Sequence, residues 1–138
     1  MAGFLLATNV ISEVRKRRPD RAVTRWFREI PADRLFLSVL VTGEIRQGVE
    51  RLRTKDPARA AALDAWLDEL GQRFRERILP VSPPVADRWG RLNAVRPLPV
   101  VDGLLAATAL VHDLTLVTRN VDDVSGLGLP VVNPWAGD

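Results

Sequence analysis

The 138-residue sequence is 46% hydrophobic, which is enough for one globular domain, expected over residues 1–138, with its own core. It has no Cys and a single His, His112, which excludes disulfides, Cys nucleophiles, thiolate zinc sites and any two-histidine metal site. A Ser-His-Asp site would depend on His112, and none of the four serines lies in a GxSxG motif. Carboxylates are therefore the expected catalytic groups. No apolar run approaches the roughly 20 residues that span a bilayer, and no secretory signal is evident, so we expect a cytoplasmic protein without a membrane partner.

The net charge is +3, and 18 of the 20 basic residues are arginines because Lys16 and Lys55 are the two lysines. The planar guanidinium suits bidentate contacts with phosphate, and a basic balance favours a polyanionic partner such as nucleic acid. GC-rich coding also produces Arg-, Ala- and Pro-rich chains, so the charge alone is a weak indication.

Short apolar runs alternate with amphipathic stretches in the first half of the chain. In chain order we expect a strand at Phe4–Leu6, a helix at Thr8–Arg15, a helix at 21–30, a strand at Arg34–Ser38 and a helix at Val39–Arg53. Thr8 or Asn9 can cap the first helix and Asp20 the second. The break between these two helices, RKRRPD, is basic and contains Pro19.

The second half continues the alternation. We expect a long amphipathic helix at 55–78, a strand at Ile78–Val81, a helix from Pro83, a helix at Val100–His112 and strands at Thr115–Thr118 and Pro130–Asn133. All five strands are short and continuously apolar, and helices separate most of them. This pattern predicts a doubly wound α/β fold, with a mainly parallel five-stranded sheet flanked by helices on both faces.

Two carboxylates stand where solvated charges are not expected. Glu44 borders the apolar stripe of its helix, and Asp102 is the only ionisable residue between Val100 and Val111. Because a buried carboxylate without a partner is unfavourable, each should have one. A structural role is open for both: Glu44 could pair with an arginine such as Arg51, and Asp102 could cap its own helix.

A third polar cluster, VTRNVDDV, follows the fourth strand and offers oxygen ligands at a turn; for Asp122, ordinary turn chemistry is the favoured interpretation. If the first and fourth strands pair, this turn and the one after Leu6 meet at the carboxyl edge of the sheet, where Glu44 and Asp102 can join them. Oxygen ligands without His or Cys suit Mg²⁺ or Mn²⁺. The missing carboxylate of such a site would stand at Ala7.

Four segments together resemble one known family. LLATNVISE is similar to an opening LLDTNVISE, and LSVLVTGEIRQGV to an S-x-x-T-x-x-E-hydrophobic-x-x-G segment. VDGLLAATAL resembles a D-x-L-I-A-A-T-A helix, and LVTRNVDDVSGLGLPVVNPW a TRN-x-x-D-F…NPW ending. In this order, and over nearly the whole chain, they resemble the PIN-domain ribonucleases, specifically the VapC/FitB-like toxins of bacterial toxin–antitoxin pairs.

The resemblance implies a five-stranded PIN sheet and a Mg²⁺-dependent endoribonuclease that cuts structured RNA of the tRNA or rRNA class, with Mn²⁺ as a possible substitute. It also implies a cognate antitoxin that wraps the toxin, homodimers and toxin–antitoxin hetero-oligomers. Arginines at the rim would hold the RNA backbone. The candidates are Arg15, Arg17, Arg18 and Arg46, although each is more simply explained as part of a solvated helix face.

The family's acidic site carries over by position. Glu44 and Asp102 match metal-binding acids, and Asn120 stands where relatives have Asp or Asn, so it is expected to be a weaker fourth ligand. Asp123 matches a further acid and lies at most behind the ligands, because Val124 replaces the aromatic residue that follows it. The matching polar positions around the site are Thr8, Asn9, Ser38 and Thr118.

Ala7 is the departure from the family, because it occupies the position of the first metal-binding aspartate. Deliberate inactivation is the favoured explanation, ahead of a naturally inactive relative and a rearranged working site. We expect little or no RNA cleavage by this chain. The alternative function is binding without catalysis, in which the chain holds an antitoxin and assists operator repression. A receiver-like phosphoacceptor domain ranks lower, because it would need a lysine near the last strand.

Overall fold

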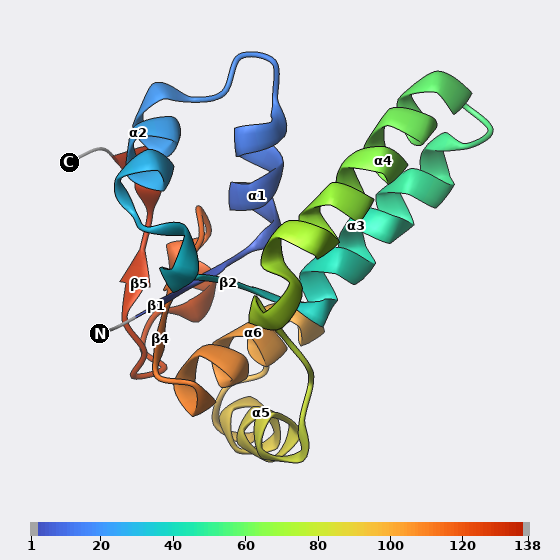
Figure 1. Ribbon diagram of the computed structural model, residues 1–138. Coiled ribbons are helices and arrows are strands. Elements are labelled where there is room, and N and C mark those ends of the chain that lie inside the picture. Colours follow the sequence, from blue (N-terminus) through green and yellow to red (C-terminus); the bar gives the residue numbers. More distant parts are fainter. Residues whose placement is uncertain (1–2, 137–138) are drawn as a thin grey trace.

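The computed structural model describes residues 3–136, and its centre is a five-stranded parallel sheet (Figure 1). The strands are β1 (Gly3–Leu6), β2 (Leu35–Ser38), β3 (Ile78–Leu79), β4 (Leu114–Val117) and β5 (Val131–Val132). Their order is β3-β2-β1-β4-β5, so β1 is central and pairs with β4, with Leu6 opposite Val117. The predicted doubly wound fold class is confirmed, and the first and fourth strands do pair, which was the condition for their two turns to meet.

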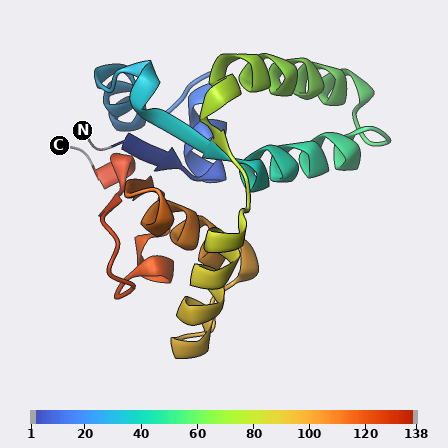
Figure 2. The same ribbon diagram turned by 60° about the horizontal axis from the view of Figure 1, so that its bottom comes forward.

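Six α-helices within residues 3–136 flank the sheet. They are α1 (Thr8–Arg15), α2 (Arg21–Glu29), α3 (Val39–Leu52), α4 (Pro57–Phe74), α5 (Pro83–Val95) and α6 (Val100–Val111). In Figures 1 and 2, α1 and α2 cover one face of the sheet, α5 and α6 cover the other, and α3 and α4 form a hairpin that projects sideways. No helix in the described part of the chain is long and apolar enough to cross a membrane.

The core forms where the strands are buried from both faces. Leu5, Leu37 and Val117 are fully inaccessible to solvent, and α6 lies close to the sheet because small residues such as Ala106 and Ala109 face it. Burial on both faces explains why the strands are continuously apolar instead of alternating.

Several element boundaries differ from the predicted ones, most of all at the end of α4. The helix expected over 55–78 ends at Phe74, and a 3₁₀ turn (Arg75–Arg77) leads into β3. The Arg77 guanidinium donates to the carbonyls of Ala32 and Leu35, and these contacts with distant residues divert the chain from the helix into the sheet. β3 ends at Leu79 and not at Val81, since Pro80 has no N–H to donate to a neighbouring strand.

Candidate active site

The carboxyl ends of β2, β1 and β4 lie at one edge of the sheet, and each leads into a polar turn. This edge is a topological switch point, because the chain leaves β1 toward β2 on one side while β4 pairs on the other. Open α/β sheets bind ligands in the crevice at such a point. The structure therefore brings the segments around Ala7, Ser38 and Thr118 together, as the sequence predicts.

Thr8 connects the start of α1 to α3. Its hydroxyl donates a hydrogen bond of 2.5 Å to Oε1 of Glu44, a residue 36 positions away. Ser38 is completely buried and caps α3, accepting a hydrogen bond from the backbone N–H of Leu40. The predicted burial of Glu44 is wrong, because its side chain is exposed, and Thr8 is its partner instead of Arg51. Helical periodicity placed Glu44 at the border of the buried face, and the residues around it leave that border open.

A second set of hydrogen bonds connects α1 to the turn after β4. The Asn9 side-chain amide donates to Oγ1 of Thr118 at 3.3 Å and accepts from the backbone N–H of Arg119 at 3.3 Å. Thr118, which is 5% exposed, also accepts from the backbone N–H of Asn120 at 3.1 Å. Asn9 and Thr118 thus fix the position of Asn120, whose own side chain is exposed.

Three carboxylates share one electrostatic environment at this edge. The pKa of Asp102 is raised above its ordinary value, chiefly by burial and then by the negative charges of Asp123 and Glu44. The N-cap of α6 is Pro99, and Asp102 lies in the first helical turn. The structure therefore overturns the capping role considered for Asp102 and places its charge in reach of the other two.

Ala7 directly precedes Thr8 and Asn9 at this edge and offers no polar side chain. It is 6% exposed, and its N–H donates to the carbonyl of Val117 at 2.9 Å. Ala7 itself is the N-cap of α1, where it makes no side-chain cap, so the capping roles predicted for Thr8 and Asn9 are wrong. Their side chains are instead engaged with Glu44 and Thr118.

These residues do not fit a resident divalent metal. Within residues 3–136, no three His, Cys, Asp or Glu side chains lie close enough together to hold a metal ion. Glu44 and Asp102 remain as a pair, and the methyl group of Ala7 cannot bind a cation.

Two residues beside the edge have roles that the sequence did not reveal. Arg96, in the turn between α5 and α6, donates to the backbone carbonyls of Asp123 and Ser125 and so holds the turn that carries Asp123. Glu13 is 6% exposed and binds Lys16 and the backbone N–H of Asp20, and these contacts lower its pKa. Glu13 is the last residue of the LLATNVISE motif, and this motif is the feature of the sequence that could have singled it out.

Comparison with known proteins identifies the family of this chain, because residues 4–124 match the PIN domain family. The chain belongs to the PIN-domain family. Toxin FitB from Neisseria gonorrhoeae is 31% identical, over 96% of this chain and 98% of that protein. The crystal structure of FitAcB from the same species has a TM-score of 0.88 at 31% identity, covering 96% of this chain and 98% of that one.

Two further relatives agree. VapC ribonuclease Y4jK from Sinorhizobium fredii is 30% identical over 96% of this chain and 97% of its own length. A toxin–antitoxin complex from Klebsiella pneumoniae has a TM-score of 0.69 at 26% identity, covering 97% of this chain and 98% of that chain. The resemblance to VapC/FitB-like PIN domains is thus confirmed.

Proposed function

We propose that this chain is the toxin of a cytoplasmic toxin–antitoxin pair, built on a Mg²⁺-dependent endoribonuclease site that Ala7 has inactivated. The observation that carries the proposal is the placement of acids beside Ala7: Glu44 accepts a hydrogen bond from Thr8, the next residue in the chain, and the charges of Asp123 and Glu44 reach Asp102. The names of the FitB and VapC relatives support a toxin with ribonuclease ancestry.

The chain's own residues prepare this site without completing it. Thr8 holds one oxygen of Glu44, while Asn9 and Thr118 fix the turn that carries Asn120. An aspartate at position 7 would add a third carboxylate, and carboxylate oxygens are the ligands that Mg²⁺ prefers. When bound, such an ion would activate water and neutralise charge on a phosphodiester.

The direct test is to restore the carboxylate. Ala7→Asp should cleave RNA in the presence of Mg²⁺ or Mn²⁺, with tRNA and rRNA as separate substrates, and EDTA should abolish the cleavage. Ala7→Asn is the matched control because it has the same size and no charge, and Ala7→Asp combined with Asp102→Asn removes the neighbouring acid. Inert Ala7→Asp protein on both RNA classes would refute the nuclease proposal.

The alternative is a function in binding alone, favoured by the intact hydrogen bonds around Ala7. The chain would form a homodimer, hold an antitoxin in a hetero-oligomer and assist repression at the operator. In that case the complex with the antitoxin should retard operator DNA more than the antitoxin does alone. Ala7→Asp should then leave the retardation of operator DNA unchanged and should cleave no RNA. Cleavage by Ala7→Asp would instead favour the nuclease proposal.

A further inference from the structure

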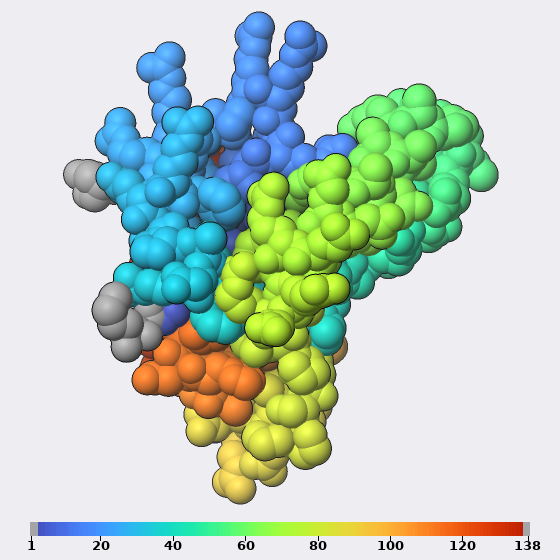
Figure 3. Space-filling model, in the orientation of Figure 1, coloured from blue at the N-terminus to red at the C-terminus, as the bar shows by residue number. Residues whose placement is uncertain are grey.

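The break between α1 and α2, together with α2 itself, concentrates the positive charge of the molecule. Residues 15–28 contain seven of the 20 basic residues and one acidic residue, so this segment carries +6 while the rest of the chain carries −3. Figure 3 shows its blue side chains standing out from one end of the molecule. The slightly basic net charge therefore conceals two regions of opposite sign.

Five exposed arginines of this segment form what we call the basic strip: Arg17, Arg18, Arg21, Arg25 and Arg28. The last three lie at i, i+4 and i+7 of α2, so they follow one face of the helix over about 10 Å. Arg17 and Arg18 lie in the loop that precedes α2, and Glu13 holds this loop by accepting hydrogen bonds from Lys16 and from the N–H of Asp20.

No arginine of the strip has an ion-pair partner within the described residues. Elsewhere, Arg46 and Arg53 both bind Glu50 and Asp64, and Arg91 binds Asp87. Arg46, a candidate for RNA binding from the sequence, is thus already neutralised. The lone acid of the segment, Asp20, caps α2 by accepting from the N–H groups of Ala22 and Val23.

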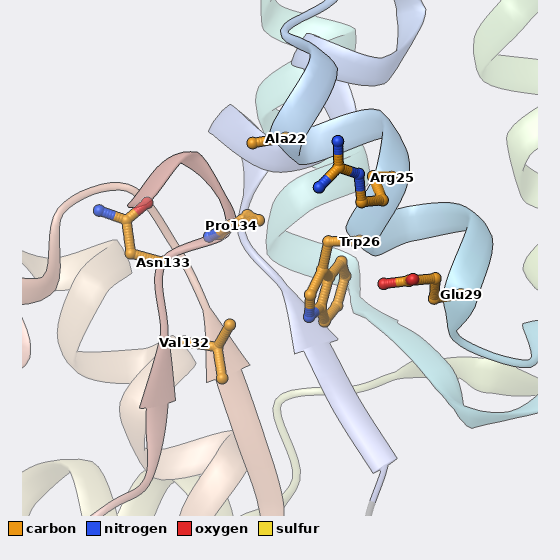
Figure 4. A pocket seen from close by; sticks show the side chains of 7 residues that line it. All are labelled: Ala22, Arg25, Trp26, Glu29, Val132, Asn133 and Pro134. Carbon is orange, nitrogen blue, oxygen red and sulfur yellow. The ribbon is translucent and has the colours of Figure 1, made fainter. Parts of the chain in front are cut away.

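Aromatic side chains alternate with the arginines in the motif Arg25-Trp26-Phe27-Arg28. Trp26 lines a hollow of about 330 Å³ between α2 and the C-terminal segment. Figure 4 shows its indole reaching toward Val132, with Arg25 above it. On the other side of α2, Phe27 and Trp66 line a second hollow of about 270 Å³. Partly exposed rings beside free guanidinium groups are the components of a surface for single-stranded nucleic acid.

We propose that the basic strip binds the phosphodiester backbone of single-stranded RNA, with Trp26 beside it as a stacking surface. The inference rests on the proposed RNA substrate and names where the chain holds it. An acidic site repels a polyanion, so the affinity must come from elsewhere on the surface. The strip begins past the C-terminal end of α1, about 10 Å along this helix from Thr8. It therefore holds nucleotides that flank the reacting phosphate.

The experiment measures binding without cleavage, on the Ala7 chain, by fluorescence anisotropy of a labelled single-stranded RNA oligonucleotide over a range of salt concentrations. The strip variant is Arg21→Gln, Arg25→Gln and Arg28→Gln. The control is Arg46→Gln, Arg53→Gln and Arg91→Gln, which removes the same charge from paired arginines. Loss of three phosphate contacts should reduce the slope of log K against log salt by about 2 and weaken binding at least tenfold, while the control retains most of both.

Trp26→Leu supplies an independent arm, because it removes the stacking surface and no charge. It should weaken binding severalfold with an unchanged salt slope. Equal losses in the strip variant and the control, or no RNA binding by the Ala7 chain at low salt, would overturn the inference. Binding of polyglutamate is measured in parallel. If the strip variant keeps its affinity for RNA and loses only its affinity for polyglutamate, the inference is also overturned, because the strip would then be a surface for an acidic polypeptide.

The outcomes also separate this inference from the proposed function. Strip-dependent binding with inert Ala7→Asp protein would support the strip and refute the nuclease. If Ala7→Asp cleaves RNA and adding the strip substitutions leaves its KM unchanged, the nuclease proposal is supported and RNA binding by the strip is refuted. If both hold, adding the strip substitutions to Ala7→Asp should raise KM much more than it lowers kcat, because the strip lies away from the reacting phosphate.

Discussion

Replacing Ala7 with Asp should make the stability of the chain depend on Mg²⁺. Position 7 is the uncapped N-cap of α1, so Asp or Asn there should each gain about 1 kcal/mol from capping. Asp also adds a negative charge beside Asp102, whose pKa is already raised by burial and by the charges of Asp123 and Glu44. In EDTA, therefore, Ala7→Asn should be more stable than Ala7→Asp, because only the aspartate repels its neighbours.

Mg²⁺ should reverse that order. An ion at about 100 times its Kd stabilises the native state by about 2.7 kcal/mol. In a chain of 138 residues, about 1 kcal/mol corresponds to a shift of 3–4 °C in Tm, so the expected increase for Ala7→Asp is about 9 °C. The parent chain and Ala7→Asn have only two carboxylates at this site, so Mg²⁺ should raise the Tm of each by less than about 2 °C.

The measurement is thermal unfolding followed by circular dichroism, in EDTA and in increasing MgCl₂, with NaCl used to match ionic strength. Adding Asp102→Asn to Ala7→Asp should remove most of the Mg²⁺ response, because it removes a second ligand. If Ala7→Asp and Ala7→Asn respond equally to Mg²⁺, position 7 does not face Glu44 and Asp102, and our account of the site is wrong.

Three further predictions concern stability. Asp102→Asn should raise Tm at pH 7, because a raised pKa means that ionised Asp102 destabilises the fold. The Tm difference between the variant and the parent should shrink as the pH drops through the raised pKa of Asp102. It should vanish below the ordinary pKa of 3.8, where Asp102 is protonated in both the folded and the unfolded chain. Glu13→Gln should cost about 1–2 kcal/mol at pH 7 in urea unfolding, since ion pairing and a backbone hydrogen bond lower the pKa of Glu13. That cost should shrink as the pH falls below 4.5 and Glu13 itself becomes protonated. Gly103→Ala should lower Tm because its Cβ would lie 3.0 Å from the Trp89 ring, whereas Gly71→Ala, with open space around it, should gain about 1 kcal/mol.

The sheet edge was predictable from the sequence because it depends on chain order and local pattern. Continuous apolar strands separated by helices indicate parallel pairing, and parallel pairing brings the turns after Leu6 and Thr118 together. The details that failed depend on contacts between residues distant in the chain. Glu44 is held by Thr8, 36 residues away, and Arg77 ends α4 through carbonyls more than 40 residues away. Helical periodicity gives the face of a helix but not what covers that face.

The hydrogen bonds at the edge bear on how Ala7 arose. The N–H of Ala7 donates to the carbonyl of Val117, and Thr8 and Asn9 bind Glu44 and Thr118, so the proposed loss of an acid at position 7 leaves the hydrogen bonds of this turn in place. Glu44 and Asp102 have no role in the proposal of binding alone, and ionised Asp102 is unfavourable at neutral pH because of its burial and the charges of Asp123 and Glu44. Mutation would be expected to remove at least one of them over time. Their retention beside Ala7 favours a recent or deliberate loss of the aspartate over a long history of binding alone.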